Sequence, residues 1–404
     1  MARPLRVLFA GLTLPYPPTN GHRLRTWAMV QALADDGHRV TLVAFAARGE
    51  ALVDLGPLRA ACAEVELVPT PLALNGGGRD ALKRVRALAS PLPFGAWKFR
   101  SPELRGALER QLARHDFDVL LCDGVYNMQN LPAHLAIPVL LNKDDVAHVL
   151  IRRYLALEPS AARRLYGALE ARKVERWERA ALQQAKAVLA CSELDKALLR
   201  ELAPTAQVVA VPNVVDTDHY APRDGAEPAT VLFQGGMDWQ PNRDAVEFFA
   251  AEILPWLRRR VPSARFRVAG RSPAESFRRR FAGIDGLEFT GTVADMRDEI
   301  AKATVCVVPL RIGSGTRLKI LEAGAMAKPM VSTGLGAEGL ELVDGEEIVL
   351  ADEPRAFADA VAALLHDAAG RDELGRGARL RVEKQYSLSV FKTALRDAVT
   401  GSLR

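Results

Sequence analysis

Residues 305–333 read VCVVPLRIGSGTRLKILEAGAMAKPMVST. The apolar run that ends at Pro309 predicts a buried strand, and a second strand is predicted to begin at Pro329. Between them, the turn Gly313-Ser314-Gly315 leads into a helical pattern over residues 316–327. A strand, a turn, a helix and a further strand in this order predict one unit of a parallel sheet covered by helices.

The turn and the start of this helix have the composition of an anion-binding site. Glycine lets backbone N–H groups come close to a ligand, and the free amides and dipole of a helix N-terminus favour negative charge. Arg317 and Lys319 add positive charge at the same end, although cations there oppose the helix dipole and so need a separate purpose. Glu322 follows one turn later and could accept both hydroxyls of a ribose. The motif therefore predicts a phosphate or diphosphate ligand.

A plainer interpretation of the same residues is left open by the sequence. Lys319 and Glu322 stand three positions apart and could simply pair on the helix surface. Gly313 and Gly315 could likewise serve an ordinary turn between a strand and a helix.

Short apolar runs alternate with longer helical patterns along all 404 residues, which predicts an α/β fold with parallel sheets. A single hydrophobic core rarely grows to this size, so two domains are expected. The clearest helical patterns cover residues 23–34, 161–184, 244–259 and 357–365. The predicted strands cover residues 7–10, 40–44, 65–68, 119–122, 139–141, 187–190, 208–211, 231–234, 265–269, 287–290, 305–309, 329–332 and 348–350.

A polar segment with Pro and Gly at residues 219–228 marks the domain boundary. We expect an N-terminal Rossmann-like domain over residues 1–217 and a second one over 218–385. A C-terminal helix within 386–404 is expected to pack back toward the first domain. Doubly wound sheets bind ligands outside the carboxyl ends of their strands, so two such domains predict a site in an interdomain cleft.

The bulk composition limits the partners and the compartment. The net charge of +5 fits a phosphorylated ligand, an anionic membrane or nucleic acid, but an ordinary Arg-rich surface explains it equally well. Cys62, Cys122, Cys191 and Cys306 form no CxxC pair, which favours reduced thiols in the cytoplasm over a zinc site or disulfides. We interpret the apolar N-terminus as a first strand, because prolines follow it where a signal-peptide cleavage site would lie.

With these motifs in view, the chain resembles the family 4 glycosyltransferases, which are retaining sugar transferases of the GT-B fold. The resemblance covers nearly the full length and is most specific at residues 313–333, which are similar to the family's donor-binding signature. The chain is similar in particular to the subgroup associated with exopolysaccharide and cell-surface glycan loci. Further similar segments are residues 15–25, 37–41, 211–216, 235–242, 268–270 and 291–295.

The resemblance implies a nucleoside-diphosphate sugar as donor substrate and assigns donor contacts. These are Gly21, Gly236, Arg271, Gly313, Ser314, Gly315, Thr316, Arg317, Lys319 and Glu322. Two features depart from the family pattern. Ser314 stands where relatives carry a first glutamate that contacts the donor sugar, and Met237 and Asn242 stand near the usual Arg and Lys. The diphosphate then depends on Arg311, Arg317 and Lys319, with Arg243 and Arg271 as further cations.

The acceptor site is expected in the N-terminal domain. Relatives carry a His after the fifth strand, where this chain has Asp144, and His148 lies one turn further on. We keep both as catalytic candidates, together with Arg317 and Lys319, although Asp144 could merely cap the following helix. Residues 19–25 and 144–148 both follow strands of the first sheet and should line the site.

The resemblance implies transfer to an acceptor hydroxyl with retention, and the leaving phosphate itself takes the acceptor proton. No Asp-x-Asp stands in a metal-binding context, so we expect neither a metal nor another cofactor. Two alternatives stay open: a GT-B sugar-nucleotide epimerase, and a silent binding subunit. A dehydrogenase is disfavoured because no Gly-x-Gly-x-x-Gly follows the first strand.

The expected partners are the donor and a glycan or lipid-linked acceptor, without nucleic acid. A basic segment over residues 79–114, with Phe94, Trp97 and Phe99, could lie on the inner face of the membrane. It could equally be an ordinary helix face and a loop.

Overall fold

The computed structural model describes residues 3–47, 49–50, 54–71, 87, 90–271 and 275–403. The chain forms two compact units, Met1–Pro212 with Phe391–Arg404, and Asn213–Val390. The first unit therefore ends shortly before residue 217, where the sequence placed the boundary. Each unit is a Rossmann-like α/β domain.

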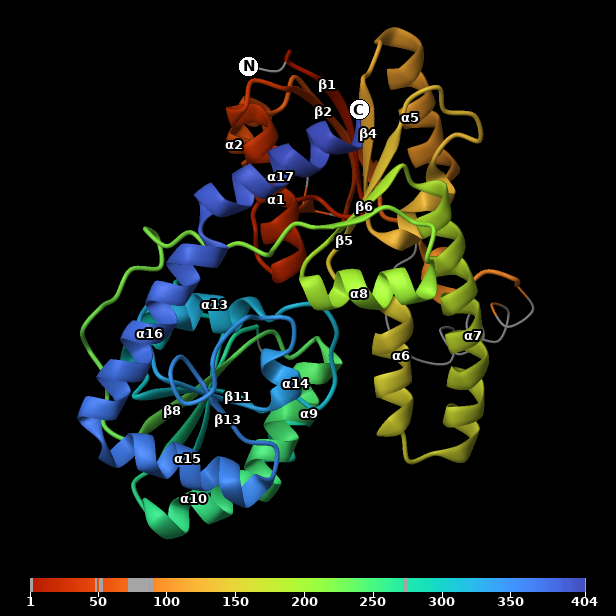
Figure 1. Ribbon diagram of the computed structural model, residues 1–404. Coiled ribbons are helices and arrows are strands. Elements are labelled where there is room, and N and C mark those ends of the chain that lie inside the picture. Colours follow the sequence, from red (N-terminus) through yellow and green to blue (C-terminus); the bar gives the residue numbers. More distant parts are fainter. Residues whose placement is uncertain are drawn as a thin grey trace. The chain divides into compact units, whose positions relative to one another are not determined.

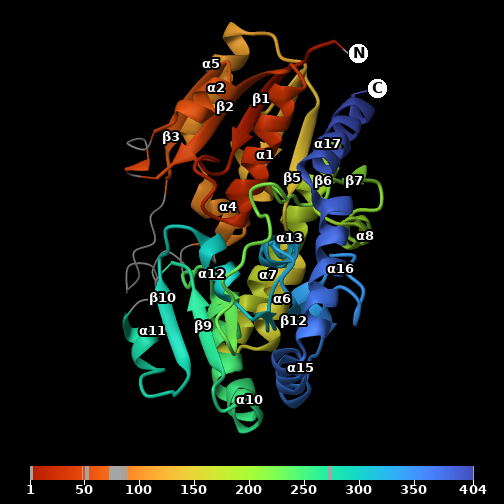
Figure 2. The same ribbon diagram turned by 90° about the vertical axis from the view of Figure 1, so that its left-hand side faces the viewer.

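The first unit is built on a sheet of seven described strands, all paired in parallel in the order β3-β2-β1-β4-β5-β6-β7. Figure 2 shows β1, β2 and β3 running alongside one another. The apolar runs found in the sequence form this sheet, and most of their side chains are buried. The strands are β1 (Arg6–Gly11), β2 (Arg39–Ala46), β3 (Glu64–Pro69), β4 (Val119–Asp123), β5 (Val139–Lys143), β6 (Ala187–Ala190) and β7 (Val208–Ala210).

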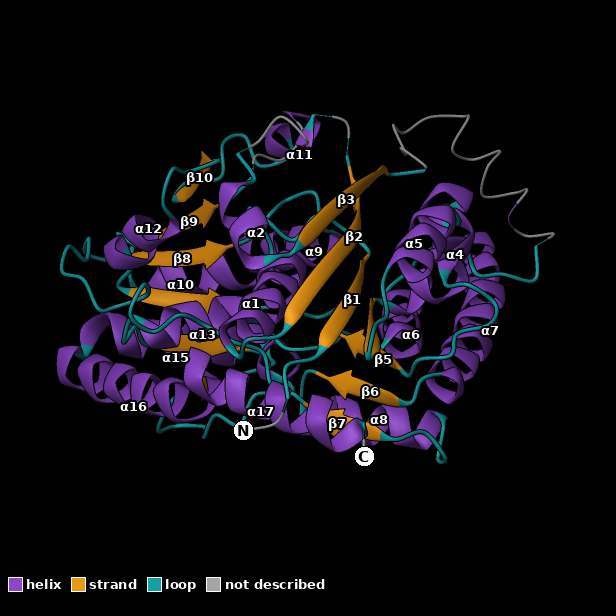
Figure 3. Cartoon of the chain, turned by 90° about the horizontal axis from the view of Figure 1, so that it is seen from above, coloured by secondary structure: helices purple, strands orange, loops and turns teal. Residues whose placement is uncertain are grey.

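Helices cover both faces of this sheet. Figure 3 shows β1, β2 and β3 between α1 and α2 on one side and α4 and α5 on the other. The helices are α1 (Gly21–Asp35), α2 (Gly56–Ala61), α4 (Phe94–Phe99), α5 (Pro102–Arg114), η2 (Val125–Asn130), α6 (Ala147–Ala156), α7 (Ala161–Gln184) and α8 (Glu193–Leu202).

The C-terminal helix α17 (Leu388–Ser402) belongs to the first unit from Phe391 onward. Lys392 pairs with Asp35 at 2.6 Å, and the Arg396 guanidinium pairs with Asp36 just after α1. These ion pairs hold the end of the chain against the helix that carries part of the candidate site.

The second unit contains six described strands, all parallel, in the order β10-β9-β8-β11-β12-β13. In Figure 1 its strands lie among helices that include α13, α15 and α16. The strands are β8 (Thr230–Gln234), β9 (Arg265–Ala269), β10 (Leu287–Gly291), β11 (Val305–Val308), β12 (Met330–Ser332) and β13 (Val349–Leu350). The helices are α9 (Gln240–Phe248), η3 (Phe249–Ile253), α10 (Leu254–Arg260), α11 (Glu275–Arg279), α12 (Met296–Lys302), α13 (Leu318–Ala325), α14 (Gly334–Ala337), α15 (Pro354–His366) and α16 (Ala368–Tyr386).

All thirteen predicted strands are present, but two predicted helices differ from expectation. The helix expected over residues 244–259 passes through the π-helical segment η3 before α10. Pro255 explains the interruption, because proline lacks an N–H and its ring clashes with the carbonyl four residues earlier. The helix expected over residues 316–327 is only Leu318–Ala325, because Arg317 has an extended backbone and Ala327 has a positive φ of 54°.

Candidate functional site

The glycine turn follows β11 at the carboxyl edge of the second sheet. Gly315 has φ of 72°, in the left-handed region that favours glycine. A Cβ on Gly313 would lie 2.5 Å from Nη2 of Arg317, so this glycine leaves room for a guanidinium rather than for a ligand. The turn is therefore built around Arg317.

Arg317 is buried at the residue that precedes α13. Its Nη1 donates to the carbonyl oxygen of Ser314 at 2.7 Å and to that of Gly315, and its Nη2 donates to Leu335 at 3.3 Å. The guanidinium therefore braces the turn, and its role as a ligand of the diphosphate stays a prediction.

Lys319 is the cation that this part of the structure leaves partly exposed. Its Nζ donates to Oδ1 of Asn242 at 2.9 Å and lies 4.0 Å from the centroid of the Phe233 ring. Burial lowers the pKa of Lys319 to about 7, and the charge of Arg317 contributes to the shift. An anionic ligand would restore the charged form.

Glu322 lies one turn further along α13, beside β8. Its carboxylate accepts from Nε2 of Gln234 at 2.5 Å and from the Tyr220 hydroxyl at 3.2 Å. Burial raises the pKa of Glu322 to about 7. Among the described residues neither Lys319 nor Glu322 forms an ion pair, so the surface pairing considered from the sequence is not found.

Glycines let the end of β9 approach the end of β8, and the end of β8 approach Lys319. A Cβ on Gly270 would lie 2.3 Å from the carbonyl oxygen of Gly235, and a Cβ on Gly235 would lie 3.1 Å from Nζ of Lys319. Arg271 pairs with Asp238 at 3.0 Å, and its guanidinium would lie 3.1 Å from a Cβ on Gly236. The edge of the sheet thus brings Gly236 and Arg271 together.

Two further residues near the turn have protein partners. Thr316 accepts a hydrogen bond from Nδ2 of Asn213 at 2.6 Å, which anchors the turn to the start of this unit. Arg311 pairs with Asp244 at 2.8 Å and lies over the Phe248 ring, so its charge is balanced by a carboxylate of the protein.

In the first unit, His22 lies between two carboxylates. Its Nδ1 is 2.7 Å from Oδ2 of Asp144, and its Nε2 is 3.0 Å from Oδ2 of Asp123. Asp123 ends β4 and also accepts from Nδ2 of Asn142 at 2.8 Å. The segment that begins with Gly21 at the start of α1 therefore meets the segment after β5 at one edge of the sheet, as the sequence led us to expect.

The two carboxylates set the charge of His22, and His22 sets that of Asp144. Burial alone would lower the pKa of His22, but the attraction of Asp123 and Asp144 outweighs it and raises that pKa well above the ordinary value. Burial would raise the pKa of Asp144, yet His22 holds it well below its usual range. His22 is therefore an imidazolium beside an ionised Asp144, whose side chain is 30% exposed.

His148 is placed differently from Asp144. Its Nδ1 lies 2.7 Å from Oε2 of buried Glu178, and Lys143 lies 2.7 Å from the other oxygen of that carboxylate. Glu178 also accepts from the backbone N–H groups of Ala147 and His148. Glu178 rather than Asp144 therefore caps α6. His148 is buried beside Glu178, and its catalytic role stays a prediction.

Sequence reasoning missed three polar residues of the two sites: Asp123, Tyr220 and Gln234. Asp123 and Gln234 do carry a signal, because each is a polar residue at the carboxyl end of an apolar strand. Tyr220 becomes visible only through its contact with Glu322.

The basic segment over residues 79–114 is described only in part. Lys83, Arg84 and Arg86 lie outside the described residues. In the described part Phe99 packs against the core, and Arg110 pairs with Glu66. The described part includes α4 and α5, and the membrane interpretation of the segment stays a prediction.

Comparisons with known proteins agree with this architecture. Residues 19–219 match the family model for Glycosyltransferase Family 4, and residues 228–367 match that for Glycosyl transferases group 1. The two matches together cover most of both units. The chain belongs to the family 4 type of glycosyltransferases and has the GT-B fold.

One curated relative is an uncharacterized 44.6 kDa protein in the cps region of Klebsiella pneumoniae, 23% identical over 176 residues. That match spans 41% of this chain and 45% of the relative's length.

Solved structures share the fold at low sequence identity. The sucrose-phosphate synthase of Thermosynechococcus elongatus has a TM-score of 0.73 at 18% identity, over 98% of this chain and 99% of that one. HepE of Anabaena, in complex with UDP-glucose, has a TM-score of 0.65 at 12% identity, over 98% and 100%. A TarM variant of S. aureus, in complex with fondaparinux, alpha-GlcNAc-glycerol and UDP, has a TM-score of 0.71 at 11% identity, over 99% and 100%.

Proposed function

We propose that the protein transfers a sugar from a nucleoside-diphosphate sugar to an acceptor hydroxyl, with retention of the anomeric configuration, in the synthesis of a polysaccharide or glycoconjugate. The observation that carries the proposal is the arrangement on α13. Lys319 and Glu322 stand partly exposed beside a glycine turn and a helix N-terminus, and neither forms an ion pair in the described part of the chain.

This arrangement supports distinct contacts for the parts of a nucleotide. The amides at the start of α13 and the ammonium of Lys319 suit a diphosphate, while Arg317 keeps the turn in shape. The carboxylate of Glu322 suits the ribose hydroxyls, which would replace the hydrogen bonds from Gln234 and Tyr220. UDP or UDP-glucose bound to the structural relatives supports a donor of this class.

The same contacts supply the chemistry. Negative charge grows on the diphosphate as the bond to the sugar breaks, and preorganised amides and Lys319 stabilise that charge. The leaving phosphate oxygen takes the proton of the acceptor hydroxyl, so no metal ion and no other cofactor are required.

Asp144 holds the acceptor in this proposal. It is the exposed member of the trio with His22 and Asp123, and its ionised carboxylate can accept a hydrogen bond from a sugar hydroxyl. The relative bound to alpha-GlcNAc-glycerol supports a glycan or lipid-linked acceptor.

The test is incubation with a panel of nucleoside-diphosphate sugars, with and without acceptor glycans, followed by NMR of the products. Transfer with the donor's anomeric configuration is expected. Conversion of the donor to an epimer without acceptor would indicate an epimerase, and nucleotide binding without any conversion would indicate a silent binding subunit.

A further inference from the structure

Helices α6 and α7 form a hairpin whose tip is apolar and exposed. The two helices pack side by side in the first unit (Figures 1 and 3). Leu165 is 67% exposed, Leu157 44% and Leu169 42%, which is unusual for three leucines within thirteen residues. The exposed apolar residues of the tip are Ala156, Leu157, Pro159, Ala161, Ala162, Leu165, Ala168 and Leu169.

These residues form one stripe rather than scattered positions. On α7 they recur at Ala161, Leu165, Ala168 and Leu169, the spacing of a single helix face. The opposite face packs on α6: a Cβ on Gly167 would lie 2.1 Å from Cδ2 of Leu155. The stripe therefore lies on the face of α7 that points away from α6.

The hairpin is strongly basic. Residues 147–184 contain eight Arg and Lys side chains and four Glu, and all four glutamates are paired with cations. Arg164, Arg172 and Arg176 form no ion pair with any described residue.

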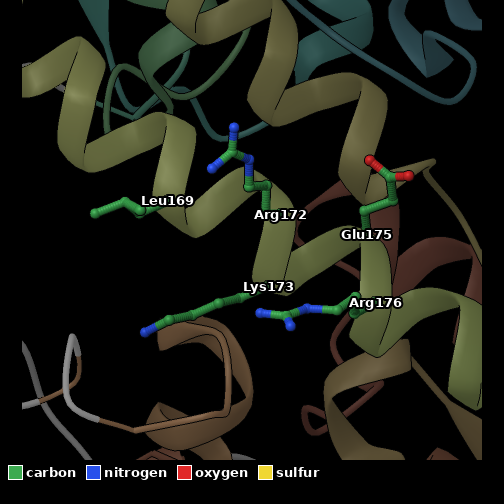
Figure 4. Close-up of a pocket in the computed structure, with 5 residues that line it drawn as sticks. All are labelled: Leu169, Arg172, Lys173, Glu175 and Arg176. Carbon is green, nitrogen blue, oxygen red and sulfur yellow. The ribbon is translucent and has the colours of Figure 1, made fainter.

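The unpaired arginines continue the apolar stripe along α7. Figure 4 shows Leu169, Arg172 and Arg176 on this helix. With Lys173 and Glu175 they line a hollow of about 580 Å³. The apolar tip and the cationic flank are thus parts of one continuous surface.

We infer that the tip of this hairpin docks on an anionic lipid bilayer, with the leucines in the headgroup layer and the arginines on lipid phosphates. An exposed apolar patch rimmed by cations fits such a surface, which attracts each basic side chain. A second copy of the chain fits poorly, because two such hairpins would bring their positive charges together. None of the described helices is long and apolar enough to cross a membrane.

Docking by this surface goes beyond the proposed transfer reaction and requires no turnover. It would place the first unit at the membrane, where the chain of a lipid-linked acceptor is anchored. Membrane binding and transfer can therefore succeed or fail independently of each other.

The experiment is flotation of the full chain with vesicles of phosphatidylcholine alone or mixed with phosphatidylglycerol, at low and at physiological salt. We compare the native chain with a Leu165→Ser/Leu169→Ser variant and an Arg164→Glu/Arg172→Glu/Arg176→Glu variant. The control carries Arg376→Glu and Leu380→Ser, at two exposed positions of α16. Circular dichroism and nucleotide binding establish that each variant is folded.

We expect the native chain and the control to float with anionic vesicles. For both hairpin variants, the partition coefficient between vesicles and buffer should fall at least about tenfold. Recovery of the native chain in the soluble fraction would overturn the inference. Undiminished binding of both hairpin variants to anionic vesicles would also overturn it. A native dimer that becomes monomeric on Leu165→Ser/Leu169→Ser would assign the surface to a second copy instead.

Discussion

The substitution Glu322→Gln is expected to weaken nucleotide binding and, at neutral pH, to stabilise the free protein. The two effects have opposite signs because the protein around Glu322 disfavours its charged form, whereas a bound ribose would favour it. The amide keeps the size of the side chain. Its NH₂ can donate to Oε1 of Gln234, which is buried without a partner.

The stability gain follows from the pKa of Glu322. Folding raises this pKa from 4.5 to about 7, which corresponds to about 3 kcal/mol of unfavourable free energy once the group is ionised. Because the folded pKa exceeds the unfolded one, the group's contribution to stability is intact below pH 4.5 and is lost as pH rises to 7. The free energy of unfolding of the variant should therefore exceed that of the native protein by about 2–3 kcal/mol at pH 8 and by little at pH 4.5.

The same substitution is expected to lower the affinity for nucleotide. Loss of a charge-assisted hydrogen bond to ribose costs about 1.5–3 kcal/mol, or roughly tenfold to hundredfold in affinity. Urea unfolding at pH 4.5 and pH 8 and calorimetry with nucleoside diphosphates measure the two effects. Glu346→Gln, at an exposed site, is the control. A variant that is less stable at pH 8, or that binds nucleotide as the native chain does, would refute the reasoning.

Three further outcomes are expected. Nucleotide affinity should be greatest near pH 7 and decline on either side, because binding needs ionised Glu322 and protonated Lys319. In calorimetry, Lys319→Met should weaken binding about tenfold and remove the decline in affinity above pH 7. If the decline is unchanged in this variant, another group causes it. Asp144→Asn and His22→Gln should lower kcat at least tenfold while the Kd for nucleotide stays within twofold, and Gly21→Val should also depress transfer. Full transfer activity in these variants would place the acceptor elsewhere. Transfer should persist in excess EDTA, and its loss, restored by a divalent cation, would contradict metal independence.

The parallel sheets could be predicted because their strands are continuous apolar runs. A run such as residues 119–122 is buried on both faces and cannot be mistaken for a surface segment. The glycine turn before α13 was also evident, since Gly315 needs its positive φ. These features depend on local sequence alone.

The roles of charged residues could not be predicted in the same way. Arg317 turns its guanidinium back onto the carbonyls of its own turn, and His148 meets a glutamate thirty residues away. The partners of His22 could not be predicted for the same reason. Asp123 ends β4 and Asp144 follows β5, and only folding places both carboxylates within 3.0 Å of the imidazole. Spacing along the chain specifies neither which way a side chain points nor which distant residue it meets.

The proposed reaction is tested most directly by NMR of the anomeric proton of the product formed from a nucleoside-diphosphate sugar and an acceptor glycan. The proposal predicts a new glycosidic linkage with the donor's anomeric configuration, and its loss in Glu322→Gln at subsaturating donor. An inverted linkage would contradict the mechanism. No linkage with any donor that the protein binds would contradict the proposed transferase activity itself.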